Sequence, residues 1–219
     1  MFLASKFFRS LPVWAFSLVL TLAAAVPATL VSGAAQLAHA ASYGESKWIS
    51  STTAVPYGWV VIRKDATNRK LIKYLIGAPY ATGVDILKES PVPSGWVFLR
   101  STMLNRTIYN LNGGPYKAKV NVELTSPIPS GWVITLNTLS YRSLYNLIGA
   151  PYKATASVEK NSLLPSGWVI TLSTALKHNV YNLNGAPKGT KATITPTSPI
   201  PSGWKIISST SLNRVIQKL

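Results

Sequence analysis

A repeat of 36 residues constrains this chain more than any other feature. The dipeptide Gly-Trp recurs with its tryptophans at positions 59, 96, 132, 168 and 204, so that only the first interval is 37 residues and the others are 36. A second marker, Gly-Ala-Pro or Gly-Gly-Pro, recurs at the same period with glycines at positions 77, 113, 149 and 185. Self-similarity at a fixed period of this size predicts a repeat protein, in which each copy is one small unit packed on its neighbours.

The first 40 residues have the pattern of a secretory signal peptide. Lys6 and Arg9 are followed by an almost wholly apolar run at 13–31, and Ala38-His39-Ala40 offers a cleavage site of small residues. The alternative is an uncleaved membrane anchor, because the apolar run approaches the length of a spanning helix. Pro27 and the small residues favour cleavage near Ala40. We therefore expect a secreted or periplasmic domain of residues 41–219, with membrane contact only through this segment if it is uncleaved.

The charge of the remaining chain favours anionic partners. Without Lys6 and Arg9, the 22 basic residues fall to 20 against 6 acidic ones, a net charge of about +14. Such a charge favours lipopolysaccharide, acidic glycans, nucleic acid or a membrane surface. The alternative is that the charge only keeps the protein soluble, since the basic residues are spread over every repeat. The chain has no cysteine, so an exported domain must be held together by its core alone.

Each copy has the pattern of short β-strands separated by turns. In the copy from Trp132 to Gly167, residues 132–136 are apolar and β-branched, residues 144–148 form a second apolar run, and residues 153–159 alternate between apolar and polar. The proline-containing connector at 124–131 is best placed at a sheet edge, because proline is not tolerated inside a sheet. The sequence therefore predicts an all-β fold of tandem 36-residue β-meanders, with units that start near each Gly-Trp tryptophan.

The two ends of the chain favour a closed ring of five units. The chain ends after the second strand of the unit that starts near Trp204, and residues 44–56 align with the pieces that this last unit lacks. Ser46 to Ser50 align with Lys119 to Glu123. Residues 44–56 would then complete the fifth unit of a β-propeller-like ring. The alternative is an open β-repeat array or solenoid, which would need distinct capping repeats at its ends.

No constellation for catalysis is recognisable in the predicted domain. Its only histidine is His178, and this residue aligns with turn arginines of the other copies. Glu123 and Glu159 occupy equivalent positions one repeat apart, which places them on neighbouring units rather than in a facing pair. No metal-ligand spacing occurs. We therefore expect a protein that is not an enzyme and uses no cofactor or metal.

Two sets of repeated residues are candidates for ligand binding. One end of the predicted ring would gather tryptophans and turn tyrosines, an arrangement that suits sugar rings: Trp96, Trp132, Trp168, Tyr80, Tyr116 and Tyr152. The other end would gather the basic turn residues Arg106, Arg142, His178 and Arg214. The alternatives are that the tryptophans pack between units and that the arginines are solvated turn residues.

These observations leave three hypotheses for function. The leading one is an exported, non-enzymatic module that recognises cell-surface glycans multivalently, as a lectin does. The second is a cationic binder of anionic polymers such as lipopolysaccharide or an acidic glycan, with nucleic acid as a partner that we do not favour. The third is a structural or interaction protein of the cell envelope.

Overall fold

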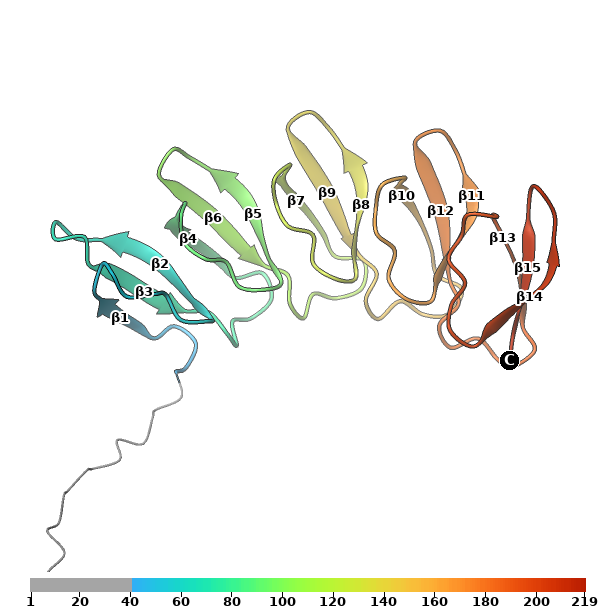
Figure 1. Cartoon of the computed structure of the whole chain (residues 1–219), viewed down its shortest axis with the longest axis horizontal. Coiled ribbons are helices and arrows are strands. Elements are labelled where there is room, and N and C mark those ends of the chain that lie inside the picture. The colour runs from blue at the N-terminus through green and yellow to red at the C-terminus, as the bar shows by residue number, and fades with distance from the viewer. Residues whose placement is uncertain (1–40) are drawn as a thin grey trace, which may run out of the picture. The chain divides into compact units, whose positions relative to one another are not determined.

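A computed structural model describes residues 41–219, and the predicted signal segment lies outside these residues. The described part consists of fifteen strands in five antiparallel sheets of three strands each (Figure 1). The described residues belong to one compact unit with its own cores. No helix that could cross a membrane occurs among the described residues. The prediction of an all-β fold built from tandem repeats is confirmed.

The strands have nearly constant lengths from sheet to sheet. The first and second sheets contain β1 (Ser46–Ile49), β2 (Trp59–Lys64) and β3 (Lys70–Tyr74), then β4 (Gly83–Leu87), β5 (Trp96–Ser101) and β6 (Asn105–Asn110). The third and fourth contain β7 (Lys119–Glu123), β8 (Trp132–Asn137) and β9 (Tyr141–Asn146), then β10 (Thr155–Glu159), β11 (Trp168–Ser173) and β12 (Lys177–Asn182). The fifth contains β13 (Lys191–Ile194), β14 (Trp204–Ser209) and β15 (Arg214–Lys218).

Every sheet has the same strand order. The last strand in the chain is central, as in β7-β9-β8, and the Gly-Trp strand pairs with it through a short hairpin. A β-bulge shifts the register of this hairpin, between Ile134 and Leu136 in the third sheet. The first strand lies at the other edge, so the proline-containing connector crosses the sheet. This connector forms no strand of its own in any of the five sheets.

The sheet boundary differs from the predicted unit by one strand. The unit predicted from the sequence joins residues 153–159 to the Gly-Trp strand that precedes them, but β10 (Thr155–Glu159) pairs with β12 of the following copy. Asn146, at the end of β9, explains this grouping. Its buried amide donates hydrogen bonds to the carbonyl oxygens of Gly114 and Pro115, at 2.7 and 3.0 Å, and so fixes the turn that leads into β7 of the same sheet.

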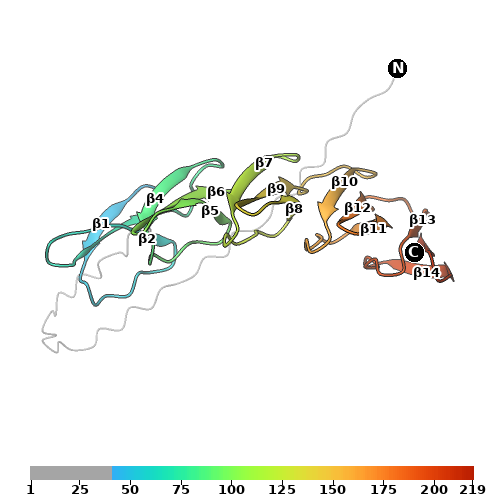
Figure 2. The same cartoon turned by 90° about the horizontal axis from the view of Figure 1, so that it is seen from above.

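Consecutive sheets pack through apolar side chains. Val133 of the third sheet is fully buried against Val158, Trp168 and Val180 of the fourth, and equivalent clusters lie between the other neighbouring sheets. Burial of such side chains contributes about 1.5–3 kcal/mol each. The sheets follow one another in chain order, as Figures 1 and 2 show. The stability of each sheet thus depends mainly on its two neighbours.

The predicted completion of the fifth unit by residues 44–56 is wrong. Strand β1, from this segment, pairs with β3 of the first sheet, and the fifth sheet has its own β13. The first and fifth sheets make no contact with each other in residues 41–219, and no sheet closes a ring.

The outward faces of the first and fifth sheets carry charged side chains at positions that are apolar where two sheets pack together. Lys47 of β1 occupies the register position of Val84, and Lys205 of β14 that of the fully buried Val169. One lysine therefore makes each end of the row of sheets more polar, as the ends of an open array require.

Candidate functional site

The repeated tryptophans lie in the core rather than on a binding surface. Trp96, Trp132 and Trp168 are each only 2–3% exposed and pack in the clusters between sheets. A sugar ring needs an accessible aromatic face, so this burial does not fit the predicted stacking role of these three residues. Their alternative role, packing between units, is confirmed.

The basic turn residues do not form an exposed ring. Arg106 is half-buried, its guanidinium lies 3.9 Å from the centre of the Phe98 ring, and its Nε donates to Ser101 Oγ at 3.1 Å. His178 is buried, with Nδ1 3.0 Å from Ser173 Oγ. Arg142 and Arg214 occupy the same register position and are also half-buried. Each of these side chains therefore lies against its own sheet, because its position in the register shares a face with core residues.

The turn tyrosines each form a pair with a second tyrosine. Tyr116 packs edge-to-face against Tyr145 of β9, with ring centres 6.4 Å apart and an interplanar angle of 69°. The other two pairs have nearly the same geometry: Tyr80 with Tyr109 at 6.5 Å, and Tyr152 with Tyr181 at 6.5 Å. All six rings are half-buried. Edge-to-face packing holds each ring in one orientation, and each pair also packs against the apolar cluster between its own sheet and the next. The three middle sheets therefore carry the same half-buried aromatic pair.

Sequence reasoning missed one half of each pair. Tyr109, Tyr145 and Tyr181 lie 36 residues apart, each directly before the buried asparagine that ends the central strand. Their period is the signal that could have found them. The contact of each with a turn tyrosine could not be recognised without the pairing of β9 with β7, which brings the turn at Tyr116 beside Tyr145.

Lysine ammonium groups lie close to several of these rings. Lys117 is 5.4 Å from the centre of the Tyr116 ring, Lys119 is 5.7 Å from that of Tyr145, and Lys153 is 5.4 Å from that of Tyr152. Lys117 and Lys153 both have positive φ, 71° and 70°, which fixes the direction of their side chains at the turn. Aromatic rings and cations are thus combined at equivalent places in the third and fourth sheets.

A hollow of about 320 Å³ lies beside Tyr145, between the third and fourth sheets. Its lining combines one aromatic ring with cations and hydroxyl groups: Lys119, Thr135, Tyr145, Ala156, Ser157 and Lys177. Lys177 crosses from the fourth sheet to donate a hydrogen bond to the Thr135 carbonyl oxygen at 2.9 Å. A hollow of this size lies within the range of small-ligand sites.

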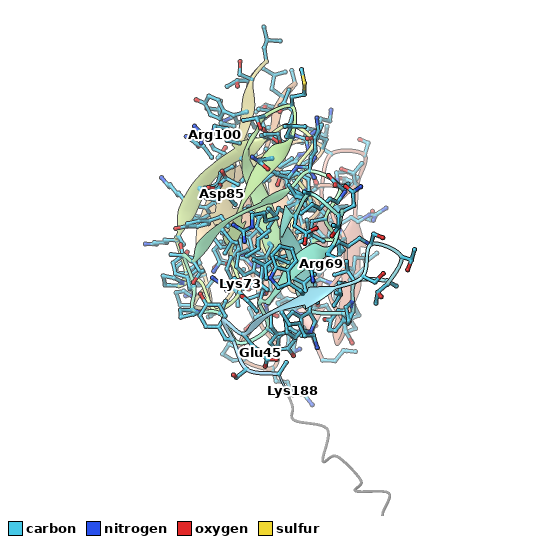
Figure 3. The ribbon with its side chains drawn as sticks, turned by 90° about the vertical axis from the view of Figure 1, so that its left-hand side faces the viewer. Glu45, Arg69, Lys73, Asp85, Arg100 and Lys188 are labelled. Atoms are coloured by element: carbon cyan, nitrogen blue, oxygen red, sulfur yellow. The ribbon has the colours of Figure 1, made fainter. Side chains whose placement is uncertain are left out.

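The outer sheets lack the tyrosine pair. The first sheet keeps a turn tyrosine, Tyr43, but has Lys73 at the position of Tyr145, and the fifth sheet has Lys188 and Gln217 at the two positions. Figure 3 shows Lys188 at the end of the molecule opposite to Arg100, where the Gly-Pro turns lie. The described residues therefore carry three complete tyrosine pairs, and the first and fifth sheets each have a polar residue in place of the central-strand tyrosine.

Burial disfavours ionisation of one hydroxyl group in each tyrosine pair. It raises the pKa of Tyr80, Tyr145 and Tyr181 above the ordinary value, and the partner tyrosine of each pair adds to the rise. These three hydroxyl groups therefore ionise at a higher pH than an exposed tyrosine does.

The search for metal-binding groups and the comparisons with known proteins add no candidate site. Among residues 41–219 no group of three or more His, Asp or Glu side chains is placed to hold a metal ion. The chain matches no protein-family model, no curated protein and no solved structure.

Proposed function

We propose that this chain is an exported, non-enzymatic module that binds glycan polymers multivalently, as a lectin does. The observation that carries the proposal is the tyrosine pair, which occurs with the same geometry in three consecutive sheets. A pyranose ring stacks its C–H face on an aromatic ring while its hydroxyl groups form hydrogen bonds. The hollow beside Tyr145 supplies both kinds of contact through its ring and its Thr, Ser and Lys groups.

The repetition supports a polymer as ligand rather than a single sugar. Each site is shallow and would bind weakly by itself. Three equivalent sites on one unit raise the effective concentration of each for a repeating ligand, so the total affinity exceeds that of any one site. We propose an open array as the working form in place of the five-unit ring, because Lys47 and Lys205 cap the two ends.

The lysines favour a glycan that carries negative charge. Lys119 and Lys177 line the same hollow as Tyr145, and Lys117 and Lys153 lie over the turn tyrosines. A purely electrostatic binder of anionic polymer is the second candidate, supported by a net charge of about +14 in residues 41–219. The two candidates differ in what salt does, because screening weakens charge contacts and leaves stacking in place.

The test is a glycan array probed at low and at high salt. We expect Tyr116→Ala and Tyr152→Ala each to weaken retention modestly, and the double variant to lose far more than the two changes together predict. Tyr141→Ala is the matched control, because Tyr141 lies on β9 with Tyr145 but outside the pair. If the double variant binds like the wild type, while Lys117→Ala with Lys153→Ala abolishes retention, the lectin proposal fails and the electrostatic one stands.

A further inference from the structure

Large apolar side chains stand exposed at the tips of four hairpins. These hairpins join the Gly-Trp strand to the central strand in the second to fifth sheets, and they point to the same side in Figure 1. The exposed residues are Met103 (88%), Leu104 (70%), Leu139 (97%), Leu176 (74%) and Leu212 (77%). Tight turns ordinarily use Gly, Asn, Asp or Ser, so a leucine or methionine in every one of these four tips is not explained by the turn itself.

A threonine holds each tip in the same conformation. In the third sheet Thr138 Oγ1 accepts a hydrogen bond from the Tyr141 amide at 3.0 Å, across the exposed Leu139. Thr102, Thr174 and Thr210 make the same contact in the other three sheets, at 3.0–3.1 Å. The apolar side chains are therefore presented on ordered turns. No ordering of the backbone is needed when a partner binds them, which favours binding.

Positive charge lies beside these tips. The amides of Lys88 and Lys160 donate to the carbonyl oxygens of Leu104 and Leu176, both at 2.9 Å, which places two exposed lysines next to the tips of the second and fourth sheets. Arg100 lies toward the same side in Figure 3. None of the residues between Thr102 and Asn105, or their equivalents in the next three sheets, is acidic. The nearby acidic residues have partners: the half-buried Glu123 and Glu159 contact Ser101 and Lys177, and the exposed Glu89, next to Lys88, forms an ion pair with Lys64.

The first hairpin differs from the other four. It carries Asp65, whose carboxylate accepts hydrogen bonds from Thr67 and Arg69, and it has no large apolar side chain at its tip. The exposed apolar tips are therefore confined to the second to fifth sheets. We call this surface the hairpin edge, defined by Met103, Leu104, Leu139, Leu176 and Leu212 with Lys88 and Lys160.

We propose that the hairpin edge docks on a lipid membrane that carries anionic headgroups. Leucine and methionine would enter the boundary between headgroups and acyl chains, and the lysines would lie at the level of the phosphates. Separate tips on successive sheets match an extended, deformable surface better than the single groove of a protein partner. This edge lies at the ends of the strands opposite to the Tyr116–Tyr145 pair, because Tyr141 begins β9 and Asn146 ends it. Membrane docking would leave the tyrosine pairs free.

The test is flotation with vesicles of phosphatidylcholine alone and with added phosphatidylglycerol. The chain starting at Ala41 is used, because the apolar run at 13–31 would bind lipid by itself and all five cores lie within the part retained. We expect binding to the anionic vesicles, with a loss of about tenfold for each of Leu139→Ser, Leu176→Ser and Leu212→Ser. Lys88→Gln and Lys160→Gln should each cost about fivefold on anionic vesicles only. Leu163→Ser is the control, because Leu163 is 88% exposed in a connector outside the hairpin edge.

A fluorescent label gives a second measurement that does not depend on total affinity. The chain has no cysteine, so Leu139→Cys and Leu163→Cys can each carry one environment-sensitive dye. A blue shift on vesicles at position 139 and none at position 163 supports the proposal. Three results would overturn it: equal binding by the triple serine variant, equal binding to neutral and anionic vesicles, or no vesicle binding together with self-association that the triple variant abolishes. The last result would identify the hairpin edge as a contact between copies of this chain.

Discussion

The side-chain oxygen of Ser126 accepts a hydrogen bond of 2.8 Å from the backbone amide of Phe98. Phe98 belongs to β5 at the edge of the second sheet, and Ser126 to the connector that leads to β8 of the third. The same contact joins Val61 to Ser90, Ile134 to Ser162 and Ile170 to Ser198, at 2.8–2.9 Å. Each connector thus satisfies an edge amide of the preceding sheet, which would otherwise be a buried donor without a partner.

Ser126→Ala should therefore destabilise the protein although it removes only one oxygen atom. Losing the partner of the Phe98 amide should cost about 1–3 kcal/mol of unfolding free energy. Ser130→Ala changes an exposed serine of the same connector and should stay within about 0.5 kcal/mol of the wild type. Urea unfolding followed by tryptophan fluorescence measures both. Equal midpoints for the two variants would show that water replaces the serine and that the contact does not hold the sheets together.

Replacement of a core tryptophan tests the packing between sheets. Trp132 is 3% exposed and lies so close to Gly114 that a Cβ atom there would be 3.0 Å from its ring. Trp132→Ala should cost about 3–5 kcal/mol, because the neighbouring sheets cannot collapse around the cavity. Trp48→Ala is the comparison of equal size: Trp48 is 39% exposed on the first sheet and should cost much less. If the Trp132→Ala variant folds with wild-type stability but binds no glycan, Trp132 is a ligand-binding residue and not a core residue.

The sequence predicts the strands well because their signal is local. The period of 36 residues, the β-branched run after each Gly-Trp and the alternation at 153–159 together indicate the strands of each copy. Even the alignment of Ser46 with Lys119 is correct, since both begin the first strand of a sheet and pair with the end of a central strand. These features depend only on residues close together in the sequence, so they can be recognised without any knowledge of the fold.

Strand partners could not be derived in the same way. A strand with one apolar and one polar face has the same sequence pattern whether it pairs with the preceding or with the following copy. The deciding contact is between Asn146 and the carbonyl oxygens of a turn 31 and 32 residues earlier, which no local pattern reveals. The error at the chain ends follows from this one: with β10 assigned to the wrong copy, the fifth unit looked incomplete. The available sequence signal for an outer face was Lys205, which stands at the position that Val169 occupies in the preceding copy.

Alkaline pH should destabilise the protein through the tyrosine pairs. Burial raises the pKa of Tyr80, Tyr145 and Tyr181 in the folded state above the unfolded value, which is about 10. A group of this kind contributes its full stability below the unfolded pKa and loses it as pH rises through the folded pKa. The urea midpoint should therefore fall above about pH 10, in parallel with the rise of phenolate absorbance.

Tyr145→Phe checks the origin of that fall. It removes one hydroxyl group from the third sheet and should make the fall in midpoint smaller. Tyr141→Phe is the matched control, because it changes a tyrosine of the same strand outside the pair, and it should keep the wild-type dependence. If both variants follow the wild-type curve, other groups cause the alkaline loss and the buried hydroxyl of Tyr145 does not contribute.

The outer faces of the array give the last prediction, which separates an open row from a closed ring. Lys205 is exposed on β14 at the register position where Val169 is fully buried, and Ile206 and Ile207 beside it are 44% and 41% exposed. Lys205→Val should leave the urea midpoint nearly unchanged but promote end-to-end association, because the outer face then resembles an inner one. Val133→Lys, the reverse change on an inner face, should unfold the neighbouring sheets, since it buries an unpaired charge. Analytical ultracentrifugation over a range of concentrations measures the association. In a closed ring Lys205 would be buried, so Lys205→Val would raise the midpoint and leave the protein monomeric.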